Sequence, residues 1–207
     1  MSNSLIVKDA IGNTLKRLTC EQPLSKISVK DITNACNISR NTFYYHFSDK
    51  YELIYWMFER DMLENVNCFN DPTKLFESFS NVCKCLFKNK KFYLACFRYV
   101  GQNSLYEYIL DYYCELFKIN LTMQYTEVGL TLTETELYLM ARMEAHALVG
   151  IISDWVKGGM QDNYMKYFDQ IIEVQKSGLM GFSVMNERKQ HQTQVDNQVI
   201  YLEKKEA

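Results

Sequence analysis

Residues 28–53 read SVKDITNACNISRNTFYYHFSDKYEL, and this stretch decides the fold of the chain. Ser28, with Asp31 three residues later, has the pattern of a capping box at the start of a helix. Asn37 is one of the few non-glycine residue types that tolerate a positive φ, so a tight turn fits at this position. Ser39 is then placed to cap a second, shorter helix. The pattern therefore predicts a helix-turn-helix unit, followed at once by another capped helix.

The second helix of this unit has the composition of a helix that reads DNA. Phe43 and Phe47 lie four residues apart, so we expect both rings to point into the core. The other side chains carry hydrogen-bonding groups and include no acid, which suits the major groove. The candidate DNA-binding residues are Ser28, Ser39, Arg40, Asn41, Thr42, Tyr44, Tyr45, His46 and Lys50.

These residues divide into two chemical roles. Arg40 can donate two hydrogen bonds to guanine, and Asn41 can pair with adenine. The hydroxyl and imidazole groups are better suited to phosphate oxygens, and Lys50 and Ser28 lie at helix starts that favour a phosphate. Two alternatives stay open, in which one of the tyrosines packs beneath the first helix and the histidine caps a neighbouring carbonyl.

This segment resembles the DNA-binding segment of TetR-type transcriptional regulators, also called the TetR/AcrR family. The resemblance rests on Ile32, Ile38-Ser39-Arg40, Thr42-Phe43-Tyr44, His46-Phe47 and Lys50. It implies an all-α protein with an N-terminal three-helix helix-turn-helix domain and a C-terminal helical domain for ligand binding and dimerisation. Asn37 replaces the family's usual turn glycine, and Asn41 stands where a small residue is common, which leaves the operator sequence open.

The resemblance also implies a function. Such regulators bind an inverted-repeat operator as homodimers, and most are repressors released by a small-molecule inducer. A minority are activators, including a subgroup that resembles regulators of dihydroxyacetone-kinase operons. We therefore expect three partners, which are operator double-stranded DNA, a second copy of the chain and an unidentified small-molecule effector.

Punctuation and periodicity give the domain organisation. We expect a helix-turn-helix domain over residues 1–48, a connecting helix over 49–70, an effector-binding and dimerisation domain over 71–185, and a disordered, polar tail over 186–207. The expected helices outside the helix-turn-helix unit cover residues 4–20, 49–66, 73–88, 91–100, 104–123, 134–157 and 163–176.

The helix expected over residues 134–157 carries a possible seam for a partner helix. Its apolar positions recur at alternating spacings of four and three residues. The resulting candidate dimer interface consists of Leu137, Ala141, Leu148, Ile151 and Trp155. The alternative is that this helix lies in the interior of the chain's own core.

The body of the chain is rich in aromatic residues, most of which must form its core. In a ligand-responsive protein, some of them would line an apolar cavity with a few polar groups. The candidate ligand-binding residues are Phe97, Tyr112, Tyr113, Glu144 and His146.

Composition narrows the class of function. Residues 1–60 carry eight basic and six acidic side chains, against fifteen and nineteen in the remainder, which fits a protein that touches DNA at one end. The seven cysteines lack a zinc-binding spacing, so we expect small buried hydrophobes, no metal site and no cofactor. Without a signal peptide or a run of about 18 apolar residues, we expect a cytoplasmic protein that does not enter a membrane.

Two other classes compete with DNA binding. We do not expect an enzyme, because the sequence has neither a glycine-rich phosphate loop nor a Gly-x-Ser-x-Gly elbow, and its three histidines are scattered. A protein-binding adaptor with a degenerate helix-turn-helix head is the other alternative. Such a helix would expose apolar anchors rather than basic and tyrosyl side chains.

Overall fold

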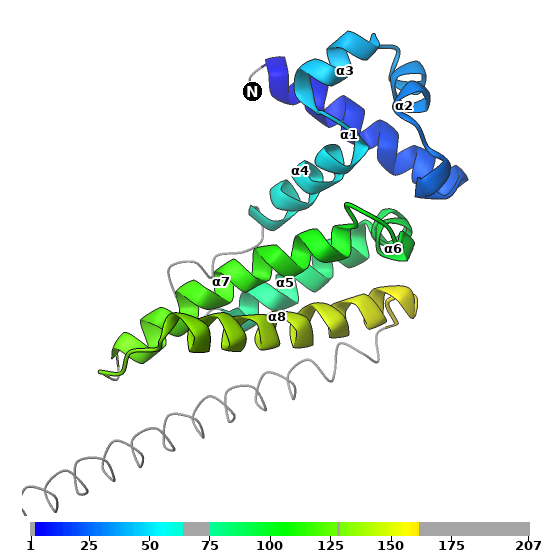
Figure 1. The fold of residues 1–207 in the computed structure, drawn as a ribbon. Coiled ribbons are helices and arrows are strands. Elements are labelled where there is room, and N and C mark those ends of the chain that lie inside the picture. The colour runs from blue at the N-terminus through cyan, green and yellow to red at the C-terminus, as the bar shows by residue number, and fades with distance from the viewer. Residues whose placement is uncertain (1–2, 64–74, 128, 162–207) are drawn as a thin grey trace, which may run out of the picture. The chain divides into compact units, whose positions relative to one another are not determined.

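The regular structure of the chain is helical, as predicted. The computed structural model describes residues 3–63, 75–127 and 129–161, and the helix expected over 163–176 and the tail expected over 186–207 lie outside these ranges. Figure 1 shows the helices in order. They are α1 (Asn3–Glu21), the short 3-10 helix η1 (Leu24–Lys26), α2 (Val29–Cys36), α3 (Arg40–His46), α4 (Lys50–Leu63), α5 (Leu75–Lys88), α6 (Lys90–Arg98), α7 (Leu105–Glu127) and α8 (Glu134–Lys157).

Local hydrogen bonds explain why α2 and α3 begin where they do. The backbone N–H of Ser28 donates to the Asp31 carboxylate at 2.8 Å, and the Asp31 N–H donates back to the Ser28 hydroxyl at 3.3 Å. Asn37 closes the turn with φ 54° and ψ 45°, in the left-handed region. The Ser39 hydroxyl accepts from the backbone N–H of Thr42 at 3.0 Å. The predicted capping box, turn and cap are all confirmed.

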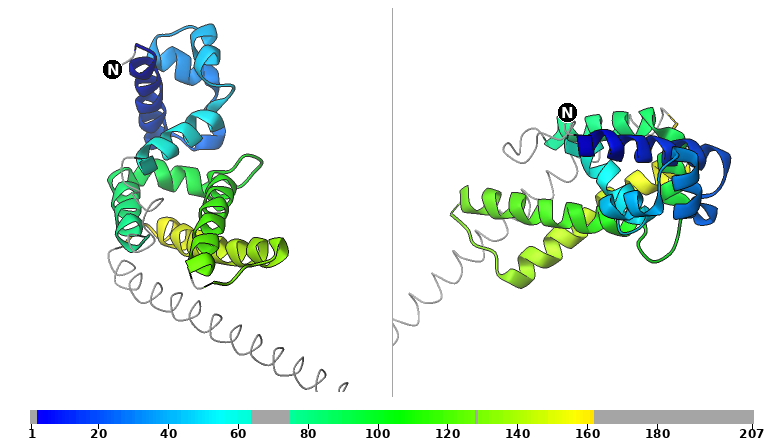
Figure 2. Two further views of the ribbon diagram at one scale, coloured as in Figure 1. Left: turned by 90° about the vertical axis from the view of Figure 1, so that its left-hand side faces the viewer. Right: turned by 90° about the horizontal axis from the view of Figure 1, so that it is seen from above.

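Helices α1 to α3 cluster around a small apolar core, which keeps them together in the views of Figures 1 and 2. Phe43 and Phe47 lie inside it, with exposed fractions of 0% and 2%, so the sequence prediction for both rings is confirmed. The core is completed by apolar side chains from α1, η1, α2 and the loop between the last two, namely Ile11, Leu15, Leu24, Ile27 and Ile32.

The start of α4 is capped in a slightly different way from the prediction. Asp49 accepts hydrogen bonds from the backbone N–H groups of Tyr51 and Glu52, at 2.7 and 2.8 Å. The Glu52 carboxylate accepts from the N–H of Ser48 at 2.5 Å, one residue before the expected partner. These bonds lower the pKa of Glu52, with the Ser48 backbone bond as the largest cause. The carboxylate therefore stays ionised where it stabilises the helix start.

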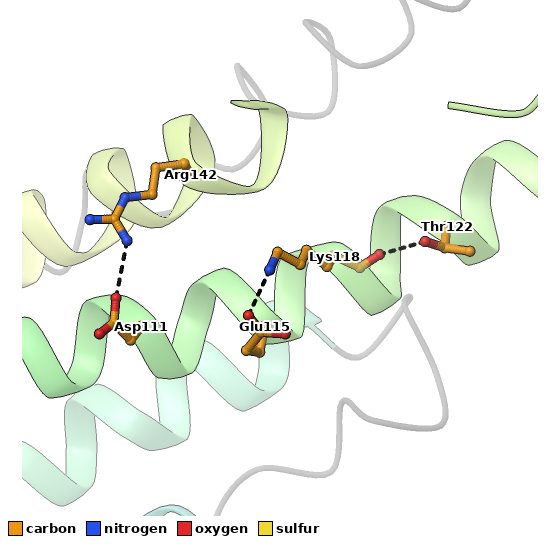
Figure 3. Close-up of polar contacts among 5 residues, drawn as sticks. All are labelled: Asp111, Glu115, Lys118, Thr122 and Arg142. Atoms are coloured by element: carbon orange, nitrogen blue, oxygen red, sulfur yellow. Dashed lines mark hydrogen bonds and ion pairs between the residues drawn. The ribbon is translucent and has the colours of Figure 1, made fainter. Parts of the chain in front are cut away.

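Helices α7 and α8 form an antiparallel pair that lies side by side in the body (Figure 1). The small side chains of Ala141 and Ala145 are fully buried, which lets the two helices approach closely. On the surface, the Arg142 guanidinium of α8 donates to Asp111 of α7 at 3.0 Å (Figure 3). Figure 3 also shows the contact of Lys118 with Glu115 along α7, at 2.7 Å.

The buried side of α8 corrects the dimer interface predicted from sequence. Ala141, Leu148 and Trp155 have exposed fractions of 0%, 6% and 1% within the single chain. They pack in the chain's own core, as the alternative interpretation of the seam supposed, and have almost no surface left for a partner. Leu137 and Ile151 are half-buried.

The opposite side of α8 is exposed and partly apolar. A step of two residues turns a helix by about 200°, so the positions two residues away from the buried ones face outward. Leu139 and Met143 are 54% and 72% exposed, and Ala147 is exposed as well. We call Leu139, Met143, Ala147 and Gly150 the outer face of α8.

Within the described ranges, we find no helix with both the length and the apolar character of a membrane span.

Replacing Leu148 by Ala should destabilise the protein by about 2–5 kcal/mol, because it removes a buried side chain between packed helices. Leu5→Ala is the matched control, since Leu5 is 43% exposed. Urea unfolding followed by circular dichroism measures both. Equal stability of the two variants would contradict the position of Leu148 in the core.

Candidate nucleic-acid interface

Four of the predicted DNA-binding side chains lie exposed on α3, away from the buried ring of Phe43. Arg40 and Asn41 are exposed, and Tyr44 and Tyr45 are 53% and 83% exposed. Neither tyrosine packs beneath the first helix, so that alternative is wrong. The side of α3 that faces away from the core therefore carries amide, guanidinium and phenol groups.

Ring contacts join the exposed aromatic groups to the core. Tyr44 meets the ring of Phe43 edge to face, with centroids 5.7 Å apart. Tyr45 meets the half-buried His46 ring in the same manner at 4.9 Å, and His46 contacts Phe47 at 6.4 Å. Edge-to-face pairs favour defined ring orientations. The tyrosines are thus supported by the same two phenylalanines that fix the helix.

The hydroxyls at the start of α3 form a local pair. Ser39 Oγ and Thr42 Oγ1 lie 2.8 Å apart, and Ser39 Oγ also accepts from the Thr42 N–H. A hydroxyl has one donor and two acceptor sites, so this pair keeps capacity for a further partner.

Ser28 was expected to contact a phosphate, and the structure gives it a different partner. Its hydroxyl donates to the Asp31 carboxylate at 2.6 Å, in addition to the backbone bond already described. These two bonds lower the pKa of Asp31, with the Ser28 side chain as the largest cause. Both Ser28 donors are therefore occupied, and the ionised carboxylate at this helix start would repel a phosphate. We assign Ser28 to capping.

Lys50 was also expected to contact a phosphate, and it too lies elsewhere. Its ammonium donates to the carbonyl oxygens of Leu24 and Ile27, at 2.8 and 2.7 Å. Desolvation is the main cause of the lowered pKa of Lys50, while Asp31 and Asp49 act in the opposite direction. The side chain ties the start of α4 to the η1 segment. Sequence reasoning missed this role because it depends on carbonyl groups more than twenty residues away.

A pair of tyrosines makes a second connection that the sequence did not indicate. The Tyr51 hydroxyl, in the first turn of α4, donates to the Tyr99 hydroxyl at the end of α6 at 2.8 Å, and their rings are 5.3 Å apart. The two residues are 48 positions apart, and no sequence motif pairs them.

A third connection surrounds Asp61 of α4. Its carboxylate accepts from the hydroxyl of the buried Tyr93 in α6 at 2.5 Å, and Lys16 of α1 lies 3.9 Å away. Burial, followed by the charge of Asp61, raises the pKa of Tyr93 well above its usual value. Tyr93 therefore stays a neutral donor, and helices α1, α4 and α6 share one polar cluster.

The five candidate ligand-binding residues do not form one pocket. Phe97 and Tyr113 are buried at 1% and 5% exposure, whereas His146 is exposed on α8. Glu144 is half-buried, and desolvation raises its pKa. We describe two clefts, one between α1 and α4 and one between the end of α1 and α6, and neither is lined by any of the five.

The buried cysteines behave as apolar groups. Burial raises the pKa of the Cys83 and Cys85 thiols to about 12, so both are neutral at physiological pH. Among the residues that the structure describes, no three His, Cys, Asp or Glu side chains gather as a metal site would require.

Comparison with known proteins places this architecture. The family described as "Bacterial regulatory proteins, tetR family" matches residues 14–55, and "Transcriptional regulator C-terminal region" matches residues 73–177, which is half of the chain.

The chain belongs to the TetR family.

One curated relative extends this assignment. The TetR-family chain is 32% identical over 97 residues to the HTH-type dhaKLM operon transcriptional activator DhaS of Lactococcus lactis subsp. lactis (strain IL1403). The match covers 47% of this chain and 52% of the relative, so it spans about half the length of that protein. It agrees with the subgroup resemblance seen in the sequence.

Solved structures share the fold of the TetR-family chain. The dihydroxyacetone kinase operon activator DhaS matches with a TM-score of 0.62, at 24% identity, over 84% of this chain and 96% of the other. NalD of Pseudomonas aeruginosa, the secondary repressor of the MexAB-OprM multidrug efflux pump, gives 0.61, at 16% identity, over 86% and 97%. The fatty acid degradation regulator FadR of Bacillus halodurans gives 0.59, at 18% identity, over 84% and 95%. The protein is a DNA-binding transcriptional regulator and not an enzyme.

Replacing Lys50 by Met should lower the free energy of unfolding by about 1–3 kcal/mol, because it removes a charged donor from two carbonyls. The salt dependence of DNA binding should not change, since this ammonium faces the protein. Lys30→Met, at an exposed position on α2, is the control and should leave stability almost unchanged. A salt slope lowered by about one unit in Lys50→Met would restore the phosphate contact.

Proposed function

We propose that this regulator binds an inverted-repeat operator as a homodimer and changes transcription when a small molecule binds to it. The observation that carries the proposal is the exposed side of α3, where Arg40, Asn41, Tyr44 and Tyr45 lie together over a buried aromatic base. A helix of this kind presents base-reading and phosphate-binding groups at once.

Each group on α3 has a part in this proposal. Arg40 reads guanine through O6 and N7, and Asn41 reads adenine through N6 and N7. Thr42, Tyr44 and Tyr45 donate hydroxyl groups to phosphate oxygens, which position the helix without reading bases. Ser39 and His46 stay in the predicted contact set at the two ends of the helix.

A dimer is needed because one short helix contacts too few bases to be selective. Two copies of α3 held about 34–36 Å apart would read two half-sites one DNA turn apart. We propose that the outer face of α8 supplies this contact. It exposes Leu139 and Met143, and the space beside Gly150 is open enough for a partner helix to approach closely. TetR-type regulators resemble one another in dimerising through their last long helices, and α8 is the longest helix described.

Two directions of regulation are compatible with this architecture. We propose a repressor that an inducer releases from DNA. Activation is the second candidate, and the specific observation in its favour is the 32% identity over 97 residues to an operon activator. Either direction requires only that the effector binds the two states of the protein with different affinity.

A gel-shift experiment with DNA fragments from around the protein's own gene tests the proposal. We expect a discrete complex on a fragment with an inverted repeat, and protection of both half-sites from nuclease. If all fragments bind equally weakly, the protein is not a sequence-specific regulator. Transcription from the bound promoter in vitro, with and without the protein, then separates repression from activation.

Replacing Arg40 by Ala should weaken operator binding by about 1–3 kcal/mol and relax the base preference at one position of each half-site. The reason is loss of a bidentate contact to guanine. Arg17→Ala is the control, because Arg17 lies on α1 and pairs with Glu21 at 3.2 Å. Binding to an operator library, read by sequencing, measures both. Equal losses on operator and random DNA would show that Arg40 contacts only phosphate.

Replacing Met143 by Arg should break the dimer while the chain stays folded, because the charge enters an apolar contact between copies and not the core. Phe87→Arg is the control, since Phe87 is 47% exposed on α5. Sedimentation gives the oligomeric state, and circular dichroism the helical content. A Met143→Arg protein that remains a dimer would exclude the outer face of α8 as the interface.

A further inference from the structure

The cleft between the end of α1 and α6 has the size and lining of a small-molecule site. Its volume is about 640 Å³, within the range of about 300–1,000 Å³ that is typical of ligand pockets. Apolar side chains from both sides line it, including Pro23, Leu94, Ala95 and the 88% exposed Val100. An apolar side chain as exposed as Val100 is available to contact a ligand.

Charge in the cleft has one sign. Lys91 and Arg98 both line it, and their spacing of seven residues places them on the same face of α6, two turns apart. The only acid in the lining, Glu21, already accepts a hydrogen bond from Arg17. Among the described residues, neither Lys91 nor Arg98 has an acidic partner within ion-pair distance. Two cations without counter-charges beside an apolar surface favour an anion with an apolar part.

The cleft is also in contact with the connections that hold α4. Tyr99 lines it and accepts the hydrogen bond of Tyr51, and Leu24 lines it and accepts a hydrogen bond from Lys50. A group bound there would touch two residues that are hydrogen-bonded to the first turn of α4. That turn directly follows the DNA-reading helix in the sequence.

From this geometry we propose that the cleft binds a small organic anion, carboxylate or phosphate in type, and that it is the effector site of this regulator. Lys91 and Arg98 hold the anionic group, and Leu94, Ala95 and Val100 contact the apolar part. The effector role rests on the proposed function, whereas the binding site does not.

The anionic fluorophore anilinonaphthalene sulfonate is a suitable probe, and its uncharged analogue phenylnaphthylamine is the reference ligand. In the full-length protein, Arg98→Gln and Lys91→Gln should each weaken sulfonate binding by about tenfold, the effect of losing one charged contact. Lys90→Gln is the matched control, because Lys90 is on the same helix but does not line the cleft. Binding of the uncharged analogue should be the same in all four proteins.

Blocking the cleft gives an independent measurement. Ala95→Trp should reduce binding of both fluorophores, because the indole occupies the space of the apolar part. Octanoate and hexyl phosphate should each displace the sulfonate from the wild-type protein, and their relative strength distinguishes a carboxylate ligand from a phosphate ligand. Equal sulfonate affinity in wild type, Arg98→Gln and Lys90→Gln would overturn the binding site.

Coupling to DNA is measured separately, by the anisotropy of a labelled operator fragment with and without the sulfonate. We expect a change in operator affinity of at least about fivefold, the lower range of allosteric coupling, which Arg98→Gln abolishes. Sulfonate bound in the cleft without any change in operator affinity would overturn the effector role. Absence of specific DNA binding in the unliganded protein would instead remove the proposed function, while the fluorophore titrations would still decide on the site.

Discussion

The arrangement of the DNA-binding region depends on the ammonium of Lys50. It joins the first residue of α4 to the carbonyls of Leu24 and Ile27, which precede α2. Because α3 lies between these two segments in the sequence, the contact closes a loop around the reading helix. The Tyr51 hydroxyl, on the next residue, reaches α6. Two adjacent side chains thus connect the reading helix to what precedes it and to the body.

Predictions from sequence succeeded where the cause was local. The Ser28 and Asp31 capping box, the left-handed Asn37 and the burial of Phe43 and Phe47 follow from preferences that act within four residues. The bounds of α8 were predicted without error, because a capping box begins this helix and a glycine pair ends it. The fold class followed from these elements and from the TetR resemblance.

Predictions failed where a residue has more than one possible partner. Lys50 is a basic residue at a helix start, which fits phosphate as well as it fits a distant carbonyl, and only the tertiary structure decides between them. The heptad pattern of α8 contained the buried side of the helix, because α7 covers Ala141 and Leu148 within the same chain. The cleft lined by Lys91 and Arg98 joins segments about seventy residues apart, so no spacing rule could indicate it.

The two sides of α8 have different consequences for how such a protein can change over generations. Substitutions at Ala141 or Leu148 disturb the fold, so selection removes most of them regardless of assembly. Leu139 and Met143 are exposed within the chain, and their replacement costs little folding energy. After gene duplication, this side can therefore diverge quickly. If copies pair through it, two related regulators in one cell can stop forming mixed pairs while each keeps an intact fold and an unaltered DNA-reading helix.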